Sequence, residues 1–238
     1  MKLVDSHCHL IRLNNYEIKG DILPVTVGFS HGSNVKTVAV AKKFGVPFVL
    51  GIAPQTAIKE ELSNLGVWTN FIEQHIPSAI GEIGLDYHWA KNDSEKELEK
   101  RVYISMIELA KKMDLPVVLH SRDAVSECLD LLNQNEFKNP IMMHFFSGDL
   151  AEAKRAVGMG GYISIPPLRS AERRKIIREI PLDRLLVESD APYVGRTPDS
   201  IKDAVKYIAE VKGIDENAVA LKTTENAKNF FKLEDLYV

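Results

Sequence analysis

Lys2-Leu3-Val4-Asp5-Ser6-His7-Cys8-His9 combines an apolar run typical of a buried strand with two histidines two residues apart. Residues i and i+2 of an extended strand point the same way, so both imidazoles can contact one ion while Cys8 faces the other side. Closely spaced histidines also occur in cores as ordinary hydrogen-bonded residues. The segment therefore predicts a first strand, and it predicts a metal site only if further ligands recur in the same setting.

Seven further apolar runs resemble this first one. They are short and nearly continuous in Val, Ile, Leu, Met and Phe, which is typical of strands buried on both faces of a parallel sheet. With the first, the runs are Lys2 to Ser6, Pro24 to Phe29, Pro47 to Ile52, Ser78 to Gly84, Pro116 to His120, Pro140 to Phe145, Gly161 to Ile165 and Arg184 to Ser189.

Amphipathic stretches lie between these runs and are spaced as helical faces. Examples are Val125, Cys128, Leu129 and Leu132, and further along Ile201, Val205 and Ile208. Strands alternating with helices in a chain of 238 residues predict an α/β fold, a (β/α)₈ TIM barrel. The competing doubly wound sheet is disfavoured, since no glycine-rich dinucleotide fingerprint follows the first strand.

The composition fits one domain spanning residues 1–238. Hydrophobic residues make up 45% of the chain and charged residues 26%, and no low-complexity block or Ser/Gly-rich linker divides it. No apolar segment approaches the ~18 residues that a membrane span needs, and no cleavable signal is evident. Cys8 and Cys128 alone make no disulfide framework. We therefore expect a cytoplasmic enzyme with no membrane partner.

Acids and histidines gather at the carboxyl ends of the expected strands. They are His7 and His9 after strand one, Glu82 in strand four, His120 and His144 at the ends of strands five and six, and Asp190 after strand eight. In a TIM barrel those ends converge on one mouth, where the active sites of this fold lie. Four imidazoles and two carboxylates exceed the needs of one tetrahedral ion and suit two divalent ions bridged by a carboxylate. We expect Glu82 to be that bridge.

Five ordered blocks of the chain resemble the signature blocks of the TatD family of metal-dependent hydrolases. They are Asp5-Ser6-His7-Cys8-His9-Leu10, Gly81-Glu82-Ile83-Gly84-Leu85-Asp86-Tyr87, Leu119-His120-Ser121-Arg122, His144-Phe145-Phe146-Ser147-Gly148 and Glu188-Ser189-Asp190-Ala191-Pro192-Tyr193, followed by a closing stretch, Asn226-Ala227-Lys228-Asn229-Phe230-Phe231. The resemblance implies a TatD-type deoxyribonuclease of the amidohydrolase-like superfamily that removes nucleotides from the 3′ end. It also implies two ions, one held by His7, His9, Glu82 and Asp190, the other by Glu82, His120 and His144.

The chain departs from the family pattern near the expected mouth. Many relatives carry Gly-Ile-His-Pro-His after strand three, where this chain has Ala53 and Gln55 in place of the two histidines. Ile11 stands where an Asp often follows the first block, and Val194–Pro198 is shorter than the usual loop. No expected ligand is lost, so the departures leave the metal chemistry intact and the substrate open.

The expected mechanism uses Asp190 and Glu82 as catalytic residues. A bound zinc ion alone lowers the pKa of its water to about 7, so two ions would generate a hydroxide that attacks a phosphodiester. We expect Asp190 to accept the proton of this water, and a role as a pure ligand is the alternative. Glu188 is expected to orient a ligand histidine. Zinc, manganese and magnesium all remain candidates, because histidines favour the first two and a carboxylate bridge accepts the third.

Phosphate recognition needs cations besides the metals. Arg122, two residues after His120, is the first candidate, since a guanidinium binds phosphate bidentately. Arg169 after strand seven and Lys91 after strand four are further candidates, and a solvated surface charge is the alternative for each.

The net charge of −3 argues against broad binding of nucleic acid. It is compatible with contacts to a few nucleotides at a strand end, and single-stranded DNA is the expected partner. It fits a small-substrate hydrolase of an ester, amide or lactone equally well, a D-aminoacyl-tRNA ester for example. A noncatalytic barrel used as a binding scaffold is disfavoured, because the ligand set is complete.

Overall fold

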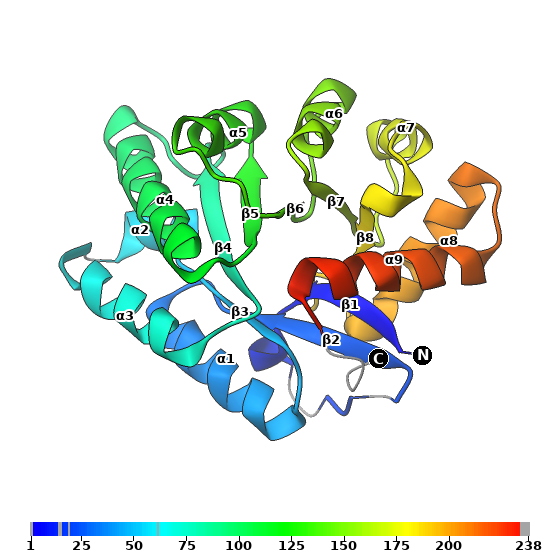
Figure 1. Ribbon diagram of the computed structural model, residues 1–238, viewed down its shortest axis with the longest axis horizontal. Helices are drawn as coiled ribbons and strands as arrows, with labels where there is room; N and C mark the ends of the chain where they lie inside the picture. The colour runs from blue at the N-terminus through cyan, green and yellow to red at the C-terminus, as the bar shows by residue number, and fades with distance from the viewer. Residues whose placement is uncertain (1, 14–15, 19, 61, 234–238) are drawn as a thin grey trace.

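A computed structural model describes residues 2–13, 16–18, 20–60 and 62–233 of the protein. Within these residues, parallel strands follow one another in chain order in a single sheet, and helices surround it (Figure 1). The strands are β1 (Leu3–Cys8), β2 (Ile22–Val27), β3 (Phe48–Leu50), β4 (Ala79–Asp86), β5 (Val117–Arg122), β6 (Ile141–Met143), β7 (Tyr162–Ile165) and β8 (Leu185–Val187). This is the (β/α)₈ barrel that the alternating runs predicted.

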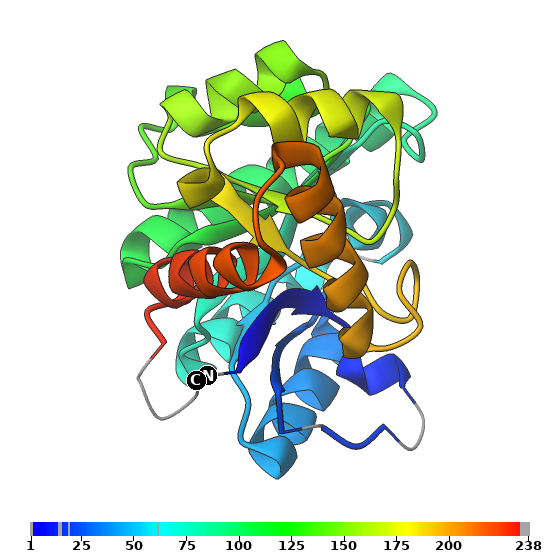
Figure 2. The same ribbon diagram turned by 90° about the vertical axis from the view of Figure 1, so that its right-hand side faces the viewer.

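The connections after most strands carry a helix, as the barrel topology requires. The helices are α1 (His31–Phe44), α2 (Pro54–Lys59), α3 (Leu65–His75), α4 (Asp93–Met113), α5 (Val125–Gln134), α6 (Leu150–Gly158), α7 (Ala171–Glu179), α8 (Ile201–Lys212) and α9 (Glu216–Phe231). Short 3₁₀ turns add η1 (Leu10–Arg12), η2 (Leu62–Asn64), η3 (Leu182–Arg184) and η4 (Pro198–Ser200). The last helix, α9, packs against β1 and β8, beside the seam of the barrel (Figure 2).

The seam between β8 and β1 is closed by backbone hydrogen bonds just beyond β8. The Asp190 N–H donates to the His7 carbonyl at 2.9 Å, and the His9 N–H donates to the Ala191 carbonyl at 2.8 Å. The first strand extends to Cys8, so His7 lies within β1 and only His9 follows it. The closure therefore places the His7–His9 pair directly beside Asp190.

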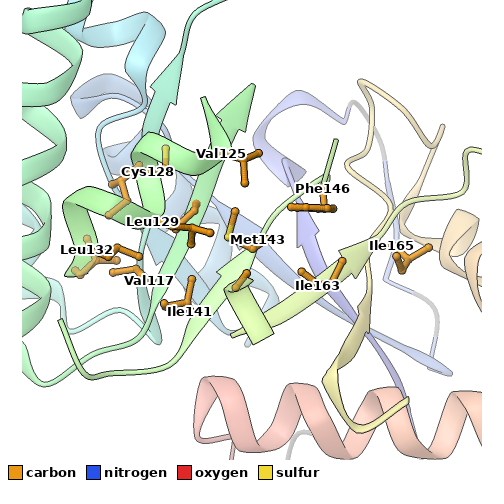
Figure 3. Close-up of a cluster of buried hydrophobic side chains, with 14 of the residues drawn as sticks. Val117, Val125, Cys128, Leu129, Leu132, Ile141, Met143, Phe146, Ile163 and Ile165 are labelled. Atoms are coloured by element: carbon orange, nitrogen blue, oxygen red, sulfur yellow. The ribbon is translucent and has the colours of Figure 1, made fainter. Parts of the chain in front are cut away.

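The helical face predicted from its spacing packs onto β5 and β6 (Figure 3). It consists of Val125, Cys128, Leu129 and Leu132, all buried. Along β5, Val117 and Leu119 belong to the same apolar layer, whereas Val118 belongs to a second cluster with Met142. Since successive side chains of a strand point to opposite faces, His120 shares the face of Val118. One strand thus packs against the helices with one face and supplies a site residue from the other.

None of the described helices combines the length and apolar character that crossing a bilayer requires. Cys8 and Cys128 are free and buried. The cytoplasmic location and the single domain over residues 1–238 stay predictions.

Candidate metal centre

All six expected ligands converge at the carboxyl ends of the strands. Their ligand atoms form three overlapping groups, and within each group the atoms lie within 4.8 Å of one another. The groups are His7, His9 and Glu82; His7, His144 and Asp190; and Glu82, His120 and His144. The first and third correspond to the two ion sites that the family resemblance implied, and Glu82 belongs to both.

Local irregularities of the backbone aim these ligands into the barrel. The pairing of β4 with β5 shifts register between Gly81 and Ile83, so Glu82 is the extra residue of a bulge. Bulges beside active sites commonly redirect a side chain in this way. Asp190 has a φ of +46°, the left-handed region that Asp tolerates better than most residues. Both carboxylates thus owe their direction to backbone geometry that strand periodicity alone does not provide.

Gly84 permits the close approach of β5 to β4 beside the site. Its φ is +135°, and a Cβ built there would lie 2.0 Å from the carbonyl oxygen of His120. A side chain at this position would push His120 away from Glu82, so glycine is required by the packing.

His7, His9 and Asp190 form the first half of the cluster. The Nε2 atoms of His7 and His9 lie 3.3 Å apart. The Asp190 Oδ1 lies 3.9 Å from His7 Nε2 and 3.6 Å from His9 Nε2. His9 Nδ1 faces the Val27 carbonyl at 3.0 Å, and because a carbonyl only accepts, this nitrogen carries the proton. His9 therefore presents a lone pair at Nε2 to the centre of the site.

His120 and His144 form the second half, and each is held by a carboxylate. His120 Nε2 donates to Asp86 Oδ2 at 2.7 Å, while its Nδ1 lies 2.7 Å from Glu82 Oε1. His144 Nδ1 donates to Glu188 Oε2 at 3.1 Å, which directs Nε2 toward Glu82 Oε1 at 3.9 Å. Glu188 thus contacts His144, one of the expected ligands.

The pKa values of the imidazoles differ between the halves. Burial lowers the pKa of His7 well below its ordinary value, and the neighbouring His144 lowers it further. Burial also disfavours the charged form of His120, but its hydrogen bonds to Asp86 and Glu82 outweigh this and raise its pKa to about 9. In the same way, Glu188 raises the pKa of His144 to about 10 against the effect of burial.

The pKa of Glu82 moves in the opposite direction. Burial acts to raise it, but the hydrogen bond from His120 and the surrounding imidazoles hold it well below its ordinary value. Glu82 is therefore ionised, the form in which a carboxylate can ligate a cation.

These donors fit divalent cations. His9 Nε2, a lone-pair atom, faces carboxylate oxygens of Asp190 at 3.6 Å and Glu82 at 4.0 Å. Acceptors that face one another without a donor between them require a positive charge at their centre. Imidazole nitrogens and carboxylate oxygens are the ligand types of zinc, manganese and magnesium sites.

A cavity of about 930 Å³ opens above the cluster, and Glu82, His120 and Asp190 are among its lining residues. Of the expected phosphate contacts, Arg122 lines it. Arg169 does not, because its guanidinium pairs with Glu210 at 2.6 Å on the surface.

Lys91 also lies outside the lining residues, and its ammonium donates to the His88 carbonyl. The structure thus brings one of the three expected cations into the site.

Arg12, Lys59, Asp86 and Gln55 are site residues that the sequence reasoning missed. Arg12 and Lys59 line the cavity from η1 and α2. Gln55, at one of the positions where relatives carry histidine, donates to Asp86 Oδ2 at 2.7 Å. Gln55 therefore fills the place next to His120. Asp86 ends β4, and its position at a strand end was the signal available for it.

Comparison with known proteins places the chain in a family. The model of the family described as TatD related DNase matches residues 4–232. The chain belongs to this family. The expected resemblance is confirmed over nearly the whole chain, and with it the enzyme class, a metal-dependent hydrolase.

Individual relatives agree with this assignment. The human protein named Deoxyribonuclease TATDN3 is 32% identical, covering 96% of this chain and 94% of that protein. A Bacillus subtilis protein named as an uncharacterized metal-dependent hydrolase, YabD, is 32% identical, covering 88% of this chain and 87% of that protein. The crystal structure of YJJV, a TatD homologue from Escherichia coli K12, superposes with a TM-score of 0.84 at 23% identity, covering 98% of both chains. This last likeness confirms the fold.

Proposed function

We propose that the protein is a deoxyribonuclease that hydrolyses phosphodiester bonds at the 3′ ends of single-stranded DNA, with two divalent ions bridged by Glu82. The observation that carries the proposal is the set of three overlapping donor groups within 4.8 Å, beneath a cavity that also holds Arg122. Membership of a DNase family and the name of the human relative support the choice of DNA.

Two bound ions would polarise a phosphodiester oxygen, lower the pKa of a water and offset the charge of the transition state. Asp190 Oδ1 faces the imidazoles of His7 and His9 at 3.9 and 3.6 Å, which leaves Oδ2 to accept the proton of the attacking water. Ionised Glu82 lies between the two halves of the cluster and contributes its negative charge to both. Arg122 donates to the phosphate from the rim of the cavity.

The depth of the ligands favours strand ends over intact duplexes. Glu82, His144 and Asp190 are only 7%, 6% and 8% exposed, so a scissile phosphate must enter the cavity to reach them. A phosphate within a duplex is held at the surface of a wide double strand, whereas an unpaired end can be threaded into the cavity. The net charge of −3 agrees with a short grip of this kind.

A substrate panel tests the proposal. The protein is stripped with a chelator, reloaded with zinc, manganese or magnesium, and given end-labelled single-stranded DNA, duplex DNA, RNA and an aminoacyl ester. We expect metal-dependent shortening of single-stranded DNA from its 3′ end, and about two ions per chain by elemental analysis. Faster hydrolysis of the aminoacyl ester than of any DNA would instead favour the small-substrate hydrolase.

Arg122→Ala tests the phosphate contact. Loss of a charge-assisted hydrogen bond should raise KM for an oligonucleotide about tenfold or more and leave a neutral ester unaffected. Arg169→Ala is the matched control, because Arg169 pairs with Glu210 outside the cavity and its loss should change neither value. An unchanged KM in Arg122→Ala would remove this residue from the substrate site.

A further inference from the structure

Two large aromatic side chains, Trp89 and Tyr193, stand exposed at the rim of the cavity. Trp89 is 51% exposed and Tyr193 is 59% exposed, and both line the cavity above the metal centre. Other exposed apolar side chains among the described residues, such as Leu221 and Val67, do not line it. Exposed aromatic rings beside a site of this kind indicate contact with a ligand that has a flat apolar face.

Tyr193 lies beside the first half of the cluster. Its ring centroid lies 5.1 Å from that of His9, and the two rings are nearly perpendicular at 73°. Its N–H donates to the carbonyl of Asp190 at 2.8 Å, so the turn that places this ligand also places the tyrosine. A group held over Tyr193 therefore lies next to the reacting phosphate.

Trp89 lies on the side of the second half of the cluster. It follows β4, and its N–H donates to the carbonyl of Asp86 at 3.1 Å. Asp86 in turn contacts His120. Since β4 and β8 lie four strands apart in an eight-stranded barrel, Trp89 and Tyr193 rise from opposite sides of the mouth.

Cations lie over two aromatic rings of the cavity lining, Trp89 and Phe29. The Lys59 ammonium lies 5.8 Å from the Trp89 ring centroid, and the Arg12 guanidinium lies 5.5 Å from that of Phe29, another lining residue. In the described part of the chain, no carboxylate forms an ion pair with Lys59, Arg12 or Arg122. Unpaired cations next to flat rings match a ligand that alternates phosphates with planar bases.

We propose that Trp89 and Tyr193 stack the two nucleobases that flank the scissile phosphate, so that the enzyme requires unpaired, unstacked nucleotides. This inference rests on the proposed function and adds how the enzyme would distinguish unpaired nucleotides from a duplex. A base inside a duplex already has both faces covered by its neighbours, whereas an unpaired base gains by stacking on an aromatic side chain. Arg12 and Lys59 bind the phosphates on either side.

The first experiment uses the unmodified protein, loaded with the most active metal. Its substrates are a thymidine trinucleotide and the analogue of the same length that lacks all three bases. If the bases stack, kcat/KM for the trinucleotide should exceed that for the abasic analogue about tenfold or more. Equal rates on the two would overturn the stacking proposal while leaving phosphodiester hydrolysis intact.

Variants identify the residues. Trp89→Ala and Tyr193→Ala should each lower kcat/KM on the trinucleotide about tenfold, with little change on the abasic analogue, and the Phe variants should keep most of the rate. Leu221→Ala, at a similarly exposed position on α9, is the control. Equal losses on both substrates would mean that the rings only shape the cavity, and no loss would exclude them from binding.

A fluorescence measurement separates stacking from chemistry. The chain has two tryptophans, so the difference in emission between the unmodified protein and Trp89→Phe reports on Trp89 alone. In chelator, the trinucleotide should quench this emission and the abasic analogue should not. Absence of quenching would overturn the stacking. Quenching without hydrolysis under any metal would instead overturn the proposed function and leave the binding of unpaired nucleotides standing.

Discussion

The two halves of the metal centre use the same ligand type but support it differently. In the first half, the outer nitrogen of His9 donates to a backbone carbonyl, and that of His7, Nδ1, is buried without a partner. In the second half, the outer nitrogens of His120 and His144 donate to the carboxylates of Asp86 and Glu188. The halves contain two histidines each, but they differ in the charge of the groups that contact the outer nitrogens: carboxylates in the second half and none in the first.

A carboxylate behind a histidine fixes the ring and makes it more basic. The second half consequently binds protons in the absence of metal, whereas burial keeps His7 neutral. The comparison teaches that an ion at the second half would have to displace protons from His120 and His144, whereas His7 in the first half has none to release.

Removing Glu82 should have the largest effect, because this residue joins the halves. Glu82→Gln keeps the shape but removes the charge shared by two of the donor groups. We expect kcat to fall about 10³-fold or more and metal content to fall with it, by assay and elemental analysis.

The control for Glu82→Gln is His75→Ala, since His75 lies on α3, stacked on Phe71 and outside the cavity lining. It should change neither activity nor metal content. Rates near those of the unmodified protein in Glu82→Gln would show that each half works alone.

Asp190→Asn tests the first half. Asn can still ligate an ion through its oxygen but cannot take a proton, so a general-base role predicts a fall in kcat of roughly 10²-fold or more with metal content retained. The rate is measured under saturating substrate. A variant that loses its metal but recovers full activity in excess metal would reduce Asp190 to a ligand.

Asp86→Asn tests the second half through the partner of His120. Loss of the charge that orients this histidine should weaken one of the two binding events by about 10- to 100-fold and leave the other unchanged. Competition with a chromophoric chelator resolves the two affinities. The matched control is Asp123→Asn, since Asp123 is an exposed acid just after β5 that lies outside the cavity. Equal weakening of both events would mean that the halves are not independent.

Protons released on metal binding should come from the second half of the cluster, because His120 and His144 are the histidines with raised pKa values. At pH 8, below the pKa values of about 9 for His120 and about 10 for His144, both imidazoles are protonated in the metal-free protein. Binding of an ion requires their neutral forms, so affinity in the second half should increase as the pH rises toward these values. Calorimetry in buffers of different ionisation enthalpy should detect release of about one to two protons per chain at pH 8.

Asp86→Asn should release fewer protons in the same experiment, since it removes the main acceptor behind His120. Proton release that is negligible at pH 8, or unchanged by this substitution, would contradict the electrostatic contrast between the halves.

Much of the barrel, and the convergence of all six candidate ligands, were predictable from the sequence alone. The strands of a parallel barrel are buried on both faces, so they appear as apolar runs whatever the details of their neighbours. Once the runs are ordered, the barrel topology places the carboxyl end of every strand at one mouth. His7, His120 and Asp190 could be placed together for this reason, without any knowledge of their contacts.

Only the tertiary structure decided which loop side chains reach the site. The sequence did not distinguish Arg122, which lines the cavity, from Arg169, which pairs with Glu210 of α8. Nor did it place Lys59 or Gln55, whose positions depend on how α2 packs beside β4. The direction of a loop side chain, or of a bulged residue such as Glu82, is set by partners far away in the sequence. That of a regular strand residue is set mainly by the period of two and the fold.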